Sequence, residues 1–315
     1  MNDAATVSAK GAQRWARGHP WIFRSDVVRP PSAAAGAVRV RDHRGKWLGM
    51  ALWSPASEIS LRLLDVDPEA ALDAHWWERR VRSAAARRAA LADETDAFRV
   101  IHAEGDDLPS LICDRYGSWL VVQLLSAGIE AFREPIVAAL LAVTKAEGIL
   151  ARNDVPMRSR EGLARETELL HGDVPREITV SEHGVRYVAA PWTGQKTGAF
   201  LDQRENRRLL GTLARGRALD CFTYHGSFAL HMARQAAHVV AVDSSAEALA
   251  RAAENAALNG FVNVEPVEAN AFDFLRDQER AGDRYDTIVL DPPAFAKSRG
   301  TLEAALRGYH EINLR

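Results

Sequence analysis

From about residue 203 onward the sequence alternates between helical segments and short apolar strands. Four strands are expected, over residues 218–222, 238–243, 264–269 and 287–291. Because a helix separates each strand from the next, the strands should be parallel, with right-handed crossovers. The third strand contains Pro266, which cannot donate a ladder hydrogen bond, so this strand should lie near a sheet edge. The fourth is a continuous apolar run, which is typical of a buried strand. The pattern indicates an α/β fold with its ligand at the carboxyl ends of the strands.

The preceding residues show a different organisation. Short alternating runs separated by turns occupy the first seventy residues, a spacing typical of a small β-barrel or sandwich. The elements expected next are a helix over 74–91, strands over 98–101, 111–114 and 119–125, a helix over 130–145, a strand over 148–152 and a hairpin over 178–188. We therefore expect three domains, at residues 1–70, 71–190 and 191–315.

Composition excludes several classes of protein. Only two cysteines occur, Cys113 and Cys221, which excludes a disulfide-stabilised scaffold. No apolar run approaches the roughly 18 residues that cross a bilayer, and no secretory signal is visible. The formal net charge is −2, but the first fifty residues hold nine Lys or Arg against three acids. We expect a cytoplasmic protein whose basic N-terminal part binds a polyanion, and which uses neither a membrane nor a metal.

Two residues at the ends of the first two parallel strands fit a bound nucleoside. Gly226 follows the first strand, and its lack of a side chain would let the backbone approach a ligand closely. Asp243 ends the second strand, 23 residues after Asp220, near the spacing at which a carboxylate reaches ribose hydroxyls. The glycine motif GxGxxG of dinucleotide sites is absent. Taken alone, this pair is better explained as a structural turn.

Polar residues at the ends of the other two strands favour a ligand site over a structural turn. Asn270 offers an amide that can face an adenine edge. Asp291 is followed by Pro292 and Pro293, which force the chain out of the sheet and leave the Asp291 carboxylate and the Pro292 carbonyl as rigid acceptors. The alternative is a strand terminator with Asp291 as a cap. The four strand ends together favour a functional site, and the absence of a phosphate-binding motif favours S-adenosylmethionine over a dinucleotide.

Short motifs spread along the whole chain resemble a known family. The most distinctive is the string from Gly194-Gln-Lys-Thr-Gly198 to Leu201-Asp-Gln-Arg204. The other matching segments are residues 18–23, 45–48, 54–57, 104–109, 124–128, 220–228, 291–293 and 307–309. On these residues the chain resembles the bacterial family of ribosomal RNA large-subunit methyltransferase I.

The resemblance implies a three-part architecture and a cofactor. It implies a small β-barrel PUA domain, a central α+β domain and a class I methyltransferase domain with a Rossmann-like parallel sheet that binds S-adenosylmethionine. The residues that it places around the cofactor are Phe222, Tyr224, Gly226, Asp243, Asn270 and Asp291, with Lys196, Thr197, Asp202 and Arg204 on a loop beside the same pocket. The family usually has an acid where Asn270 stands, so an adenine contact there loses charge but keeps an acceptor.

The resemblance also implies a reaction, the methylation of carbon 5 of a cytosine in 23S rRNA. Carbon 5 is a poor nucleophile, so the family attacks carbon 6 with a cysteine thiolate. Asp291, with Pro292 beside it, would be catalytic by holding protonated cytosine N3. The family's nucleophilic cysteine would lie beyond residue 315, and only four of the seven strands of the fold are present. We therefore expect a sheet that is incomplete at the C-terminus and an inactive chain, with Cys113 and Cys221 as packing residues.

The ribosomal RNA partner would be engaged by the basic N-terminal part. Arg14, Arg17, His19 and Arg24 are the candidate RNA-binding residues, whereas Trp21 and Phe23 are expected in the barrel core. Two other functions remain open. One is methylation of an exocyclic amine of guanine or adenine in RNA, which needs no cysteine; the other is a noncatalytic RNA-binding protein that keeps a cofactor fold. The sequence does not indicate an oligomeric state.

Overall fold

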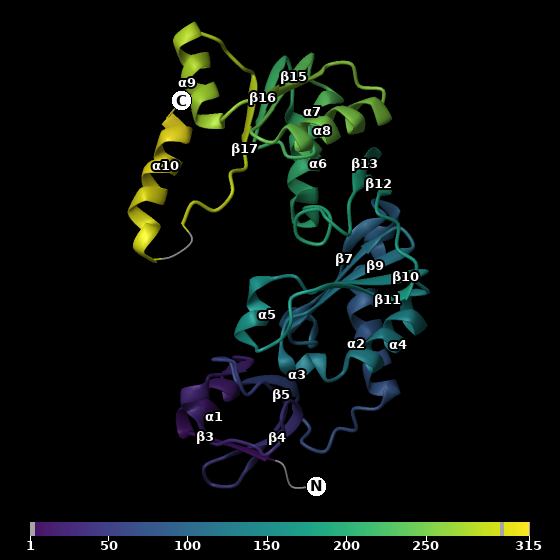
Figure 1. Cartoon of the computed structure of the whole chain (residues 1–315), viewed down its shortest axis with the longest axis vertical. Coiled ribbons are helices and arrows are strands. Elements are labelled where there is room, and N and C mark those ends of the chain that lie inside the picture. Colours follow the sequence, from purple (N-terminus) through teal and green to yellow (C-terminus); the bar gives the residue numbers. More distant parts are fainter. Residues whose placement is uncertain (1–3, 297–298, 315) are drawn as a thin grey trace. The chain divides into compact units, whose positions relative to one another are not determined.

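The computed structural model describes residues 4–296 and 299–314 (Figure 1). The chain divides into two compact units. The first comprises the residues up to Ile178 together with Ala189–Ala199, and the second comprises Thr179–Val188 and the residues from Phe200 onward. Across the described ranges, no helix combines the length and the apolar character needed to cross a membrane.

The N-terminal part of the first unit is a six-stranded sheet with the order β2-β6-β5-β4-β1-β3. The strands are β1 (Ala4–Val7), β2 (Trp21–Ile22), β3 (Val27–Arg29), β4 (Gly36–Asp42), β5 (Trp47–Trp53) and β6 (Leu61–Asp65). Along β4, buried Val38 and Val40 alternate with half-buried Arg39 and Arg41, so one face of the sheet forms a core and the other is polar. Helix α1 (Ala9–Ala16), capped by the Ser8 hydroxyl, was not predicted.

The rest of the first unit packs two helices against a five-stranded sheet with the order β11-β10-β9-β8-β7. Its elements are α2 (Ala74–Ala86), β7 (Ala97–His102), β8 (Leu111–Tyr116), β9 (Trp119–Leu124), α3 (Ala127–Glu130), α4 (Arg133–Thr144), β10 (Gly148–Arg152), α5 (Pro156–Arg160) and β11 (Thr167–Gly172). Trp77 of α2 is fully buried in the core of this sheet. The expected elements are present, whereas α3, α5 and β11 were missed by the sequence analysis.

The second unit contains the predicted parallel sheet, with the order β16-β15-β14-β17. Its elements are the hairpin β12 (Ile178–Glu182) and β13 (Val185–Ala189), then α6 (Arg204–Leu213), β14 (Arg217–Cys221), α7 (Ser227–Ala233), β15 (His238–Asp243), α8 (Ala246–Leu258), β16 (Val264–Glu268), α9 (Ala271–Ala281), β17 (Thr287–Leu290) and α10 (Leu302–Leu314). Strand β16, which contains Pro266, lies at an edge, as predicted. The C-terminal end of α10 lies near α9 (Figure 1), and Leu275 of α9 and Ile312 of α10 belong to the same buried apolar cluster.

The expectation of a buried fourth strand was wrong. Within the described residues β17 pairs only with β14, so its other edge has no neighbouring strand. Val289 is buried, but the side chain of Ile288 is 47% exposed. A continuous apolar run reports the composition of a strand and not its position in the sheet, which explains the error.

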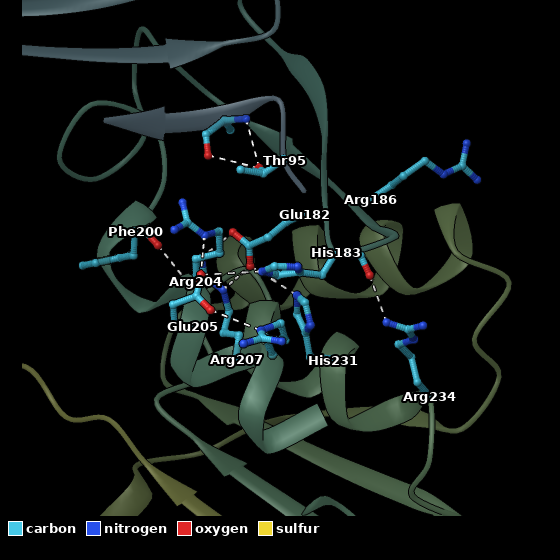
Figure 2. A network of polar contacts seen from close by, with 12 residues as sticks. Thr95, Glu182, His183, Arg186, Phe200, Arg204, Glu205, Arg207, His231 and Arg234 are labelled. Atoms are coloured by element: carbon cyan, nitrogen blue, oxygen red, sulfur yellow. Dashed lines mark hydrogen bonds and ion pairs between the residues drawn. The ribbon is translucent and has the colours of Figure 1, made fainter. Parts of the chain in front are cut away.

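A buried ion pair fixes the β12–β13 hairpin to the parallel sheet domain. Glu182 of β12 receives two hydrogen bonds from the guanidinium of Arg207 of α6, each 2.7 Å long, and both side chains are buried (Figure 2). Arg207 also donates to the carbonyl oxygen of Phe200, at 2.8 Å. On the other side, Asn255 of α8 accepts a hydrogen bond from the backbone of Val188 at 2.9 Å. The hairpin is therefore an integral layer of the second unit.

Candidate functional site

The loop after β14 has an unusual backbone. Phe222, Tyr224 and Gly226 all have positive φ angles, of 65°, 52° and 85°. Such angles are strained for residues with a side chain and persist where the surroundings fix them, commonly at functional sites. Gly226 is required for a second reason, because a Cβ atom there would lie 2.9 Å from the Cβ of Ala252 in α8. The sequence analysis assigned this glycine to a close ligand approach, but the contact that excludes a side chain is with α8.

Asp220 hydrogen-bonds to this loop and to the helix that follows it. Its Oδ2 atom accepts hydrogen bonds from the Thr223 hydroxyl, at 2.6 Å, and from the backbone N–H of Ala229 in α7, at 2.9 Å. The side chain is fully buried, and its Oδ1 atom has no hydrogen-bond partner within the described ranges. Burial, together with the charges of Asp291 and Asp243, raises the pKa of Asp220 to about 7, although the two hydrogen bonds act in the opposite direction.

Asp243, at the end of β15, hydrogen-bonds to the same loop. Its Oδ2 atom accepts a hydrogen bond from the backbone N–H of Tyr224 at 2.9 Å, and its Oδ1 atom accepts one from Ser245 at 3.0 Å. The side chain is half-buried. Because an ionised carboxylate has about four acceptor positions, Asp243 keeps acceptor capacity beyond these two bonds. It is therefore chemically able to bind ligand hydroxyls while it fixes the backbone of Tyr224.

Asp291 follows β17, on the opposite side of β14 from Asp243. Its carboxylate is exposed and lies 3.3–3.4 Å from the amide nitrogen of Gln203, which donates to it. Gln203 and Asp291 line an open cavity of about 320 Å³ along β17 and α6. Residues 292–296, which follow Asp291, are not helical. Gln203 was not identified from the sequence.

Asn270 has a structural role that the sequence analysis did not consider. It is the N-cap of α9, and its Oδ1 atom accepts hydrogen bonds from the backbone of Phe272, at 3.0 Å, and of Asp273, at 3.4 Å. The acceptor expected to face an adenine is therefore engaged in capping, and the amide NH₂ is the part of the side chain suited to a ligand.

The four expected loop residues fall into different units. Thr197 belongs to the first unit, where its buried hydroxyl donates to Asp114 at 2.6 Å and lies 3.0 Å from the Tyr116 hydroxyl. Lys196 beside it is exposed and has a positive φ of 54°. Asp202 and Arg204 belong to the second unit, and Arg204 donates to Glu205 at 2.9 Å.

Three of the four predicted RNA-binding residues have protein partners. The Nδ1 atom of His19 accepts a hydrogen bond from the backbone N–H of Trp21 at 3.1 Å. The Arg14 guanidinium lies 3.1 Å from the carboxylate of buried Asp26 and stacks over Phe23 at 4.8 Å. Arg24 donates to the carbonyl oxygens of Ala56 and Ser57. These contacts stabilise the sheet domain itself. Arg17 and His19 are exposed.

The two cysteine side chains are buried. Burial raises the pKa of Cys221 to about 12, and the charge of Asp220 acts in the same direction. Burial likewise raises the pKa of Cys113 far above its ordinary range. Because the thiolate is the nucleophilic form, neither residue has the properties of a nucleophile. Their expected packing role agrees with this geometry.

His225 is a further unusual residue of the loop after β14. Its ring is buried, stacks on Tyr187 of β13 at 5.3 Å and meets Tyr224 edge-on at 4.7 Å. Within the described ranges, neither ring nitrogen has a hydrogen-bond partner. Burial, and secondarily the charge of Arg207, lowers the pKa of His225 to about 4, so the ring is neutral near pH 7. No sequence pattern distinguishes such a histidine from an exposed one.

Comparison with family models identifies two parts of the chain. Residues 5–65 match the model of a PUA-like domain, and residues 106–312 match the model of an S-adenosylmethionine-dependent methyltransferase. These matches agree with the folds described above: the mixed sheet at the N-terminus and the parallel sheet of the second unit.

Two relatives match nearly the whole chain. The chain is 40% identical over 307 residues to the ribosomal RNA large subunit methyltransferase I of Shewanella amazonensis, covering 95% of this chain and 78% of that protein. It is 37% identical to the corresponding protein of an Escherichia coli O139:H28 strain, covering 98% and 80%.

Two solved structures share the fold at 22% identity. A candidate SAM-dependent methyltransferase from Streptococcus mutans has a TM-score of 0.79, with 96% of this chain and 81% of that chain covered. A candidate methyltransferase complexed with SAH has a TM-score of 0.82, with 98% and 83% covered.

Proposed function

This chain belongs to the ribosomal RNA large subunit methyltransferase I family, and we propose that it directs methylation to carbon 5 of a cytosine in 23S rRNA. The S-adenosylmethionine-dependent fold and the PUA-like domain define the coarse function, an rRNA methyltransferase. The observation that carries the proposal is the pair of carboxylates, Asp243 and Asp291, which end the two strands on either side of β14.

Asp243 is the proposed anchor of the cofactor ribose. Bound S-adenosylmethionine supplies an electrophilic methyl group, and the loop of Phe222, Tyr224 and Gly226 is the proposed wall of its pocket. The Asp243 carboxylate accepts from the two ribose hydroxyls while its bond to Tyr224 keeps the loop in place. The Asn270 amide donates to the adenine edge. We extend the pocket to Asp202 and Arg204, which belong to the same unit, on the family resemblance alone.

Asp291 and Pro292 are the proposed contacts of the target base. The exposed Asp291 carboxylate is suited to hold a protonated cytosine N3, and Gln203 orients it through the amide contact at 3.3–3.4 Å. Attack on carbon 6 requires a thiolate, and the buried thiols of Cys113 and Cys221 do not supply one. Cys113 and Cys221 are therefore not the nucleophile of the proposed reaction.

The test is incubation of the chain with S-adenosylmethionine and 23S rRNA, followed by mass spectrometry of the nucleosides. Formation of 5-methylcytidine supports the proposal, and calorimetry with S-adenosylmethionine measures cofactor binding separately. Methylation of an exocyclic amine needs no thiolate, so 2-methylguanosine or 6-methyladenosine would replace the cytosine assignment. A chain that binds S-adenosylmethionine but forms no methylated nucleoside agrees with the inactivity expected from the sequence. The cytoplasmic location remains a prediction.

A further inference from the structure

The polar face of the N-terminal sheet carries one continuous row of side chains across four strands. The pairing registers place Trp47 of β5 opposite Arg41 of β4, Arg41 opposite Thr6 of β1, and Thr6 opposite Arg29 of β3. Arg39 lies two residues from Arg41 on β4, on the same face because side chains alternate along a strand. The row therefore brings together three arginines and a tryptophan from segments that are distant in the sequence.

These residues line a cavity, which we call the arginine trough and define by Arg29, Arg39, Arg41 and Trp47. Its volume is about 440 Å³, within the range of roughly 300–1,000 Å³ that is typical of small-ligand pockets. The opposite face of the same strands is the apolar core of the sheet, so the trough is the outward face. It lies on a different set of residues from Arg14, Arg17, His19 and Arg24.

The side chains of the trough are held in place but remain accessible. The Arg39 guanidinium lies 4.7 Å from the centre of the Trp47 ring and pairs with the exposed Glu69 at its outer end. The Arg41 Nε atom donates to the Thr6 hydroxyl at 3.1 Å. Trp47 is nevertheless 39% exposed, and Arg29 is exposed. An exposed tryptophan surrounded by arginines is poorly explained by packing, because a large aromatic ring gains stability when it is buried.

We propose that the arginine trough binds a nucleotide of single-stranded RNA. A base stacks on the Trp47–Arg39 pair, since aromatic rings and guanidinium planes both accept unstacked RNA bases. The adjoining phosphates bind Arg41 and Arg29, whose guanidinium groups match phosphate geometry through paired donors. A duplex fits this arrangement poorly, because its bases are stacked on one another. The inference rests on the proposed function for the identity of the polyanion.

The test is the binding of a fluorescently labelled, mixed-sequence single-stranded RNA of roughly ten nucleotides, a length typical of single-strand sites. Fluorescence anisotropy of the full chain is measured over a range of salt concentrations. Trp47→Ala is expected to weaken binding roughly fivefold to tenfold through loss of stacking. Arg29→Gln and Arg41→Gln are expected to weaken binding and to reduce the salt slope by about one each.

Arg82→Gln is the matched control, because Arg82 is an exposed arginine of the same unit on α2, outside the trough. It should leave the affinity close to that of the wild type. Arg29→Gln serves as the second variant if the loss of the Arg41–Thr6 contact impairs folding, and thermal unfolding checks each variant. Unchanged binding in Trp47→Ala and Arg29→Gln overturns the inference, as does a full chain that binds no single-stranded RNA.

Further measurements distinguish the class of ligand and test the inference independently of the proposed function. Equal loss of heparin and RNA binding in the arginine variants, with no effect of Trp47→Ala, identifies a general polyanion patch and overturns the nucleotide assignment. Equal affinity for duplex RNA overturns the single-strand assignment. Calorimetry with S-adenosylmethionine should give the same affinity in all trough variants. If the methyltransferase proposal fails, binding of S-adenosylmethionine or the methylated product is absent, but Trp47→Ala still binds RNA more weakly than the wild type.

Discussion

The guanidinium of Arg207 donates to both carboxylate oxygens of Glu182 at 2.7 Å, and both side chains are withdrawn from solvent. His231 lies 3.2 Å from the same carboxylate (Figure 2). Burial alone would raise the pKa of Glu182, but His231 and Arg207 outweigh it and lower the pKa to about 2. The pair therefore stays ionised over the physiological range and joins β12 to α6.

Removing the positive partner should be costly. Arg207→Met leaves Glu182 charged, buried and without its main counter-charge, so we expect a loss of about 3–5 kcal/mol in the free energy of unfolding. Urea titration followed by circular dichroism measures this loss. Arg208→Met, on the same helix but exposed and paired with the exposed Glu205, should change stability by less than about 1 kcal/mol. Equal losses of unfolding free energy in the two variants would show that the buried ion pair stabilises the fold no more than an exposed one.

His225 should make the protein less stable in acid. Its folded pKa of about 4 lies below the usual 6.5, so the unfolded chain binds the proton more tightly. The stabilising contribution is complete above pH 6.5 and is lost as the pH falls to 4, up to about 3 kcal/mol in total. His225→Phe should remove this part of the pH dependence, and His43→Gln, an exposed control, should not. A variant profile that parallels the wild type would refute the assignment.

Asp220 should make the protein less stable as the pH rises, the opposite of the effect of His225. Its folded pKa of about 7 lies above the usual 3.8, so its contribution is complete below pH 3.8 and is lost as the pH rises through 7. Asp220→Asn keeps an oxygen for Thr223 and Ala229 but cannot ionise. We expect the stability of this variant relative to the wild type to increase between pH 4 and pH 8, by up to about 4 kcal/mol. Chemical unfolding at several pH values measures the difference, and a pH-independent difference would argue against a raised pKa.

Asp243 should control cofactor affinity. Asp243→Ala removes both the proposed ribose acceptor and the bond that holds Tyr224, so calorimetry should show S-adenosylmethionine binding roughly 10- to 100-fold more weakly. Asp243→Asn, which keeps one acceptor oxygen, should lie between this variant and the wild type. Asp277→Ala, an exposed acid on α9, is the control. Wild-type affinity in Asp243→Ala would exclude the ribose role.

Much of the second unit could be predicted because its pattern is local. The alternation of helix and strand, the Pro266 edge strand and the polar strand ends are all properties of neighbouring residues. Helix α8 is one of the helices expected between the strands, and the N-cap Ser245 and an apolar stripe at helical spacing define it. Helix α1 was missed because it is only eight residues long and contains Gly11, a poor helix former.

The sequence by itself determined the parallel α/β architecture, the order in which its polar residues meet at the strand ends, and the resemblance to a family. Only the tertiary structure decided that Asn270 caps α9, that Arg14 binds buried Asp26, and that His225 is buried beside Tyr187. It alone aligned Trp47, Arg41 and Arg29 across four strands. The reason is that secondary structure follows the spacing of nearby residues, whereas burial, charge partners and strand register depend on segments that are distant in the chain.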